Sequence, residues 1–174
     1  PKCSSYVSAA HDGTIRIWSP SMKHELTVHI SDTKLPIAIN DMVVISGMSK
    51  LAVASADRVV SFYELLDHAS SQRWALFARI ALVDMPLALA AWSTSSETSL
   101  QSTERGVQCL GIGDDSGCVH IFDVKRLLGI VKAEIDSHVS KHVKGEREVR
   151  ALTAAFVDPA KLITLQLHSD WISR

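Results

Sequence analysis

The sequence is poor in several features by which a function is often recognised. Its 174 residues include 18 Lys or Arg and 19 Asp or Glu, so it lacks the basic surplus typical of nucleic-acid binding proteins. Its longest apolar run, residues 80–92, is interrupted by Asp84 and Pro86 and is shorter than the about 20 apolar residues that span a bilayer. We therefore expect no nucleic-acid partner and no membrane segment.

Cysteine is also scarce, and the chain has only Cys3, Cys109 and Cys118. Their number is odd and no two have the spacing of a zinc site, so neither a disulfide framework nor a structural metal is indicated. This usage is typical of a reducing, intracellular compartment. The first residues show no initiator Met and no signal-peptide pattern, and we expect Pro1 not to be the true start of the protein.

With 47% hydrophobic and 21% charged residues, the chain has a composition that can form a packed core. It also contains a repeated hairpin pattern. In each hairpin, apolar, small or β-branched residues flank a turn, and an aromatic residue closes the second strand. The three hairpins are residues 6–18, 50–63 and 107–122. Their closing aromatics, Trp18, Tyr63 and Phe122, lie 45 and 59 residues apart.

A repeat of about 40–45 residues with such hairpins is typical of a β-propeller. Further strand-like segments lie between the hairpins, which gives four strands per repeat: residues 25–30, 38–45, 74–82 and 87–92. A flexible Ser/Thr-rich loop insertion at 93–106 accounts for the longer second interval. The sequence therefore predicts an all-β fold, a partial propeller of about three to four blades of four antiparallel strands. We expect residues 1–174 to be a fragment of a larger propeller, because closed propellers have 4–8 blades.

The hairpins resemble those of the WD-repeat family, in which a turn aspartate precedes a strand that ends in Trp-Asp. The first hairpin matches well, through Asp12 and Trp18, whereas the second and third are degenerate versions. In the third, either Asp114 or Asp115 takes the place of the turn aspartate. His168 occupies the position of the histidine in the Gly-His pair with which a blade of this family begins. The resemblance implies a network of His, Asp, Ser or Thr, and Trp within a blade, although no blade of this chain has all four.

Five segments are similar to a narrower group, the tandem-propeller WD-repeat proteins of motile cilia and flagella, which often bear EF-hands: residues 40–44, 50–55, 60–65, 86–89 and 113–121. This resemblance implies a structural component of the axoneme, in the cytoskeleton, whose partners are other axonemal proteins and tubulin. No EF-hand loop occurs in the chain, so calcium binding is not implied. A WD-repeat adaptor of a cytosolic or nuclear complex is the alternative.

One candidate metal site lies in a segment with helical periodicity, residues 124–143. Glu134, His138 and His142 recur every four residues, which would place a carboxylate and two imidazoles along one helix face. The chain would then be a metal-binding sensor. We favour a solvated helix face, because the pattern lacks a fourth ligand and a zinc-protease glutamate.

The same helix belongs to a charged, partly helical insertion, residues 125–159. An insertion of this length is either a docking element for another chain or a loop that covers the edge of a blade. The sequence does not decide between these alternatives.

No pattern in the sequence indicates catalysis or a bound cofactor. Gly111, Gly113 and Gly117 have the wrong spacing for a phosphate-binding loop, and a strand follows them where such a loop needs a helix. Two clusters contain triad-like residue types, Ser8 with His11 and Asp12, and His168 with Ser169 and Asp170. Each lies within one short segment that is explained as part of a hairpin or blade opening. We therefore expect a non-enzymatic protein-interaction scaffold with no catalytic, cofactor or metal residues and no small-molecule substrate.

Overall fold

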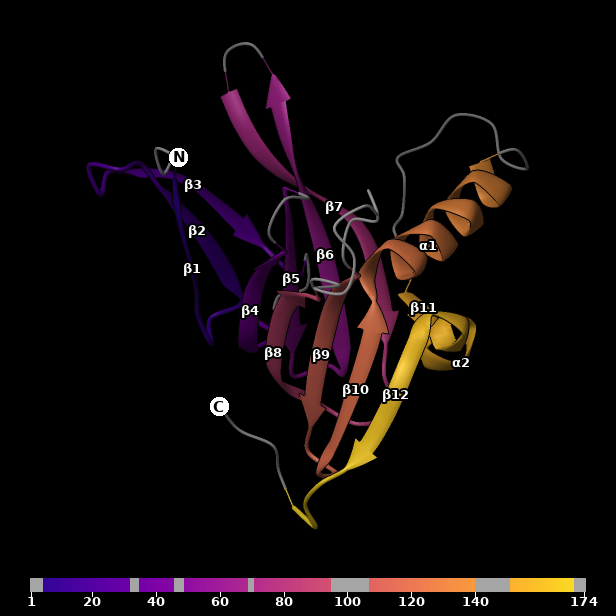
Figure 1. The fold of residues 1–174 in the computed structure, drawn as a ribbon. Coiled ribbons are helices and arrows are strands. Elements are labelled where there is room, and N and C mark those ends of the chain that lie inside the picture. Colours follow the sequence, from indigo (N-terminus) through magenta and orange to yellow (C-terminus); the bar gives the residue numbers. More distant parts are fainter. Residues whose placement is uncertain are drawn as a thin grey trace, which may run out of the picture.

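The computed structural model describes residues 5–31, 35–45, 49–68, 71–94, 107–139 and 151–170. They form three sheets that follow one another along the chain (Figure 1). The first sheet is an antiparallel meander in the order β1-β2-β3, with β1 at Tyr6–Ala9, β2 at Thr14–Trp18 and β3 at His24–His29.

The second sheet has four consecutive antiparallel strands and one strand added from a distant part of the chain. The consecutive strands are β4 (Ile39–Ile45), β5 (Lys50–Ser55), β6 (Val59–His68) and β7 (Ser71–Ala81). The added strand, β11 (Ala151–Thr153), pairs in parallel with β7 at the sheet edge. The β6–β7 hairpin projects beyond the rest of the sheet (Figure 1).

The third sheet is again a four-stranded antiparallel meander, in the order β8-β9-β10-β12. Its strands are β8 (Pro86–Ser93), β9 (Gln108–Asp114), β10 (Cys118–Asp123) and β12 (Lys161–Gln166). The connection from β10 to β12 contains helix α1 (Val124–Val139), strand β11, the short helix α2 (Ala154–Val157) and the single 3-10 turn η1 (Asp158–Ala160).

Two apolar cores separate the three sheets, because the second sheet is apolar on both faces. Alternate side chains of β5 and β6 point to opposite faces. Leu51, Val53 and Tyr63 pack toward the first sheet, whereas Val60 and Phe62 pack toward the third. The second core also takes buried residues from the β10–β12 connection: Val124, Leu127, Val131, Val157 and Ala160.

Neighbouring sheets are also joined through their first strands. The Asp41 Oδ2 atom of β4 accepts a hydrogen bond of 2.7 Å from the Leu89 amide of β8. The Asn40 Nδ2 atom donates to the Pro86 carbonyl at 2.9 Å. Consecutive meanders stacked in chain order through their first strands have the arrangement of neighbouring propeller blades. The fold is therefore all-β, as the repeat predicted.

The strands predicted from the sequence are confirmed, with boundaries that differ by a few residues. The first sheet has three described strands where four were expected, and the second has five. Helix α1 lies where helical periodicity was predicted and is described as far as Val139. The rest of that segment and residues 95–106 of the predicted loop lie outside the described residues.

Strand β11 was not predicted, since three residues are too few to show a periodicity. It covers the edge of β7, which is the position that the edge-covering alternative gives to the insertion. Within the described part of the chain, no helix combines the length and the apolar character needed to cross a membrane.

Candidate functional site

A four-residue turn connects the two strands of each hairpin, β1 to β2, β5 to β6 and β9 to β10, and all three turns lie at the same end of the sheets (Figure 1). The turns span residues 10–13, 55–58 and 114–117. In each, the last amide donates to the first carbonyl, at 3.1, 3.2 and 3.4 Å respectively. The last residue of each turn has a positive φ: 74° at Gly13, 64° at Arg58 and 84° at Gly117. The first two hairpins, which lie 45 residues apart, thus have the same turn geometry.

Each turn pairs an aspartate with a hydroxyl side chain. The Asp12 Oδ1 atom accepts from the Thr14 hydroxyl at 2.6 Å, and Asp57 Oδ1 accepts from Ser55 at 2.6 Å. In the third turn Asp114 Oδ1 accepts from Ser116 at 2.7 Å. Asp12 and Asp57 are the third residues of their turns, whereas Asp114 is the first of its turn. Of the two residues that the sequence left open, Asp114 therefore makes the turn contacts.

The second carboxylate oxygen of each turn aspartate faces a basic side chain. Asp12 Oδ2 lies 3.4 Å from Arg16, and Asp57 Oδ2 lies 3.3 Å from Arg79. Asp114 Oδ2 lies 2.8 Å from His120 Nε2. Arg16 in β2 and His120 in β10 hold equivalent positions, three residues after their turns, but they differ in residue type, and Arg79 comes from a different strand, β7. For this reason the pattern of hydroxyl, aspartate and base was missed in the sequence.

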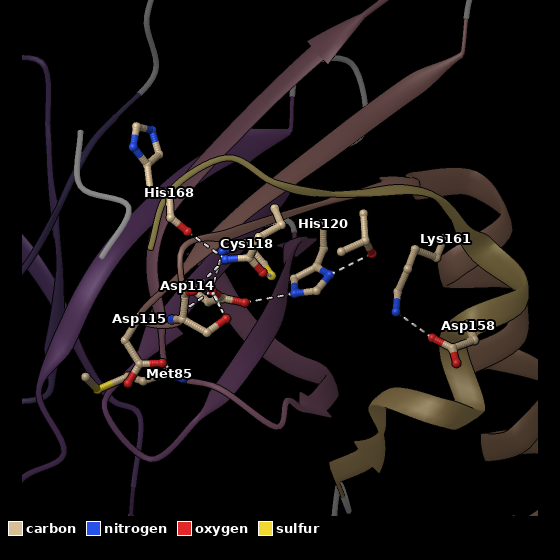
Figure 2. Close-up of polar contacts among 11 residues, drawn as sticks. Met85, Asp114, Asp115, Cys118, His120, Asp158, Lys161 and His168 are labelled. Atoms are coloured by element: carbon tan, nitrogen blue, oxygen red, sulfur yellow. Dashed lines mark hydrogen bonds and ion pairs between the residues drawn. The ribbon is translucent and has the colours of Figure 1, made fainter. Parts of the chain in front are cut away.

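The third turn has the most extensive network (Figure 2). His120 joins the buried Asp114, whose side chain is 1% exposed, to the Thr164 hydroxyl of β12, which lies 3.0 Å from Nδ1. The amides of Ser116 and Cys118 also donate to Asp114 Oδ1. Burial opposes the charged form of this carboxyl, but the hydrogen bonds outweigh it and hold the pKa of Asp114 below its ordinary value of 3.8.

Segments on both sides hold the third turn in place. The Gly117 carbonyl accepts from the amides of Leu167 and His168, at 3.1 and 3.3 Å. Gln166 Nε2 donates to the carbonyls of Ser116 and His168, at 2.9 and 2.6 Å. On the other side, Asp115 exchanges two hydrogen bonds with the backbone of Met85 (Figure 2). Residues 166–168 therefore form a clasp over the turn, which we call the C-terminal clasp.

Two of the triad-like residues of the first hairpin, Ser8 and Asp12, make contacts within that hairpin. The Ser8 hydroxyl accepts a 2.9 Å hydrogen bond from the Trp18 indole. Asp12 is engaged by Thr14 and Arg16. The first sheet thus has the Ser–Trp contact and the turn aspartate that the WD-repeat resemblance implies. The glycines of the third hairpin are also where expected, in strand β9 and its turn, followed by strand β10.

The candidate metal ligands are only partly covered by the structure. Glu134 lies in the second half of α1, as does His138, whose side chain lies outside the described residues together with the whole of His142. Across the ranges that the structure describes, no three His, Cys, Asp or Glu residues gather in a way that could hold a metal ion. Cys109 and Cys118 are free thiols, and burial raises the pKa of Cys109.

Neither a family model nor a curated protein matches the chain. Among solved structures, the chain is similar to one described as "Structure of U3-55K", with a TM-score of 0.41 and 15% sequence identity. That match covers 70% of this chain and 43% of the other, so the chain spans less than half of the structure it matches. A likeness of this size does not assign the chain to a family.

The positive φ of Arg58 leads to a first prediction. A residue with a Cβ atom is strained in this conformation. In the other two turns, glycine occupies the same position. We expect Arg58→Gly to raise the free energy of unfolding by about 0.5–1 kcal/mol, because relief of strain exceeds the entropy that glycine adds to the unfolded chain. Urea unfolding measures the change, and a loss of stability would contradict the turn geometry.

The lowered pKa of Asp114 leads to a second prediction, on pH. Because the folded pKa lies below 3.8, this carboxylate stabilises the fold fully above that pH and loses its contribution as the pH falls through the folded pKa. Asp114→Asn should cost about 2 kcal/mol at neutral pH and progressively less in acid. Chemical unfolding of both proteins between neutral and acid pH measures this difference. A difference that stayed constant with pH would refute the assignment.

Proposed function

We propose that this chain is a non-enzymatic scaffold for protein–protein interactions, built from WD-type propeller blades. The observation that carries the proposal is the repeated turn. The turn aspartates and their hydroxyl and basic partners are engaged in contacts that fix a hairpin, as in the Asp114–His120–Thr164 network. Rigid turns on stacked sheets provide a fixed surface, and recognition by repeat proteins uses such surfaces.

We further propose an axonemal setting in a cilium or flagellum, or a related microtubule assembly, with axonemal proteins and tubulin as partners. Support for this setting comes from the five sequence segments that resemble ciliary WD-repeat proteins. A net charge of −1 suits docking among proteins better than electrostatic adhesion to an acidic surface.

Fractionation of ciliated cells tests the setting. The native protein should remain with axonemes after detergent removes the membranes, and salt should release it, because polar protein contacts weaken as ionic strength rises. A pool that is wholly soluble in detergent would refute the axonemal setting and favour the cytosolic or nuclear adaptor.

A surface variant tests whether helix α1 is a docking element of the scaffold. The exposed side of α1 carries Lys125, Arg126 and Lys132, which could contact an acidic region of a protein partner. Lys132→Glu should lower the fraction retained on axonemes, or on whichever complex holds the protein. Lys23→Glu makes the same charge change at an exposed site between β2 and β3 and serves as the control. Equal retention of both variants would exclude α1 as a docking element.

A further inference from the structure

Arg58 ends the second turn in a conformation that the fold does not require an arginine to adopt. The last residue of each turn makes the same two backbone contacts: its amide donates to the first carbonyl of the turn, and its carbonyl accepts from the residue that follows the outer strand of the sheet. Gly13 and Gly117 make both contacts without a side chain, and at positive φ without strain. The arginine therefore strains the turn and adds nothing to its backbone bonding.

The Arg58 side chain does not stabilise the fold through a polar contact either. It is exposed, and within the described ranges no residue forms an ion pair or a hydrogen bond with its guanidinium group. By contrast, Arg16 and Arg79, which lie beside the first and second turns, are paired with Asp12 and Asp57. A strained residue whose side chain is left for contacts outside the chain is typical of a binding site.

The surroundings of Arg58 suit contact with another protein. The Leu82 amide donates to the Arg58 carbonyl at 2.8 Å, which places the next residue, Val83, beside the turn. Val83 is 74% exposed. The turn lies at the opposite end of β6 from the projecting β6–β7 hairpin, so this hairpin does not cover it (Figure 1). Arginine next to exposed apolar surface is enriched where proteins bind one another.

We propose that Arg58 is a recognition residue of the scaffold, whose guanidinium group binds an aspartate or glutamate carboxylate of a protein partner, and that Val83 contacts an apolar side chain beside it. The planar guanidinium donates two parallel hydrogen bonds to a carboxylate. This inference rests on the scaffold function proposed above and names one of its contact sites.

A carboxylate fits this site better than a phosphate group. Phosphate groups carry up to two negative charges and are typically held by clusters of arginines. Here Asp57 precedes Arg58 in the turn, and its carboxylate is paired with the neighbouring Arg79. The local charge thus favours a ligand with a single negative charge.

Gradient sedimentation of gently lysed cells tests the proposal, with the full-length protein expressed as wild type or with one substitution. Dilution of the lysate before sedimentation gives the apparent dissociation constant of the complex that contains the protein. Arg58→Gly should raise this constant at least about tenfold, because a charge-assisted pair of hydrogen bonds is lost. Since the same variant should resist urea better than the wild type, its loss of binding would not result from unfolding.

Three further variants define the contact. Arg58→Lys keeps the charge without the parallel pair of donors, so it should weaken the complex less than glycine does, and it tests the same contact if the glycine variant does not fold. Val83→Ser should weaken the complex several-fold. Arg16→Ala, the control, removes an arginine that is already paired with Asp12 and should leave the dissociation constant unchanged.

The outcomes distinguish this inference from the function on which it rests. A wild type that sediments only as a free chain would overturn both. A wild type in a complex that Arg58→Gly joins equally well would overturn the role of Arg58 alone. Phosphatase treatment should leave the complex intact, and a complex that it dissolves would contradict the carboxylate ligand.

Discussion

Gly117→Ala is expected to lower the free energy of unfolding by about 3 kcal/mol, of which about 1–2 comes from the strain of a Cβ atom at positive φ and the rest from weakened hydrogen bonds. An added Cβ atom would lie 2.3 Å from the His168 carbonyl oxygen and 2.7 Å from that of Asp170. Both neighbours are backbone atoms, so the C-terminal clasp must move. Urea unfolding measures the loss.

Gly129→Ala is the matched control for this substitution. Gly129 lies in α1, and an added Cβ atom there meets nothing within 4 Å. Because alanine favours a helix over glycine, this variant should gain about 1 kcal/mol. If Gly117→Ala were as stable as the wild type, the clasp would not hold the turn as described.

Phe62→Ala should cost about 3–5 kcal/mol, because it removes a large side chain from a core that can collapse only in part. Phe62 is fully buried between the second and third sheets, where it contacts Phe77 with ring centroids 6.2 Å apart. The substitution leaves a cavity at the contact between two sheets, so both sheets should lose stability together.

Phe156→Ala makes the same chemical change at a residue that is 41% exposed in α2. Its cost should stay below about 1 kcal/mol, since surface truncations have small effects. Thermal and urea unfolding of both variants give the comparison. Equal costs would show that Phe62 does not lie in a core between sheets.

The hairpins could be predicted from the sequence because their signals are local. A turn pair, alternating apolar residues and a closing aromatic all lie within about 15 residues of one another. The choice between Asp114 and Asp115 could not be made in this way. It depends on which residue begins the turn, and in the third repeat the aspartate and the hydroxyl residue exchange their places relative to the second.

The contacts that the sequence did not reveal join residues far apart in the chain. Thr164 reaches His120 across 44 residues, and β11 pairs with β7 across a still longer interval, as in the pair Ala151 and Arg79. Neither has a local pattern, because one is a single hydroxyl on an edge strand and the other is a three-residue strand. The register of the sheets, which sets both contacts, follows from tertiary packing.

Amide hydrogen exchange at Leu89 tests most directly whether the sheets stack as neighbouring blades. The Leu89 amide donates to Asp41 Oδ2 of the preceding sheet, so it should be protected in the wild type and exchange at least about tenfold faster in Asp41→Ala. Amides shared by β10 and β12 should be unaffected. A Leu89 amide that exchanges at the same rate in both proteins would contradict the stacked-blade arrangement.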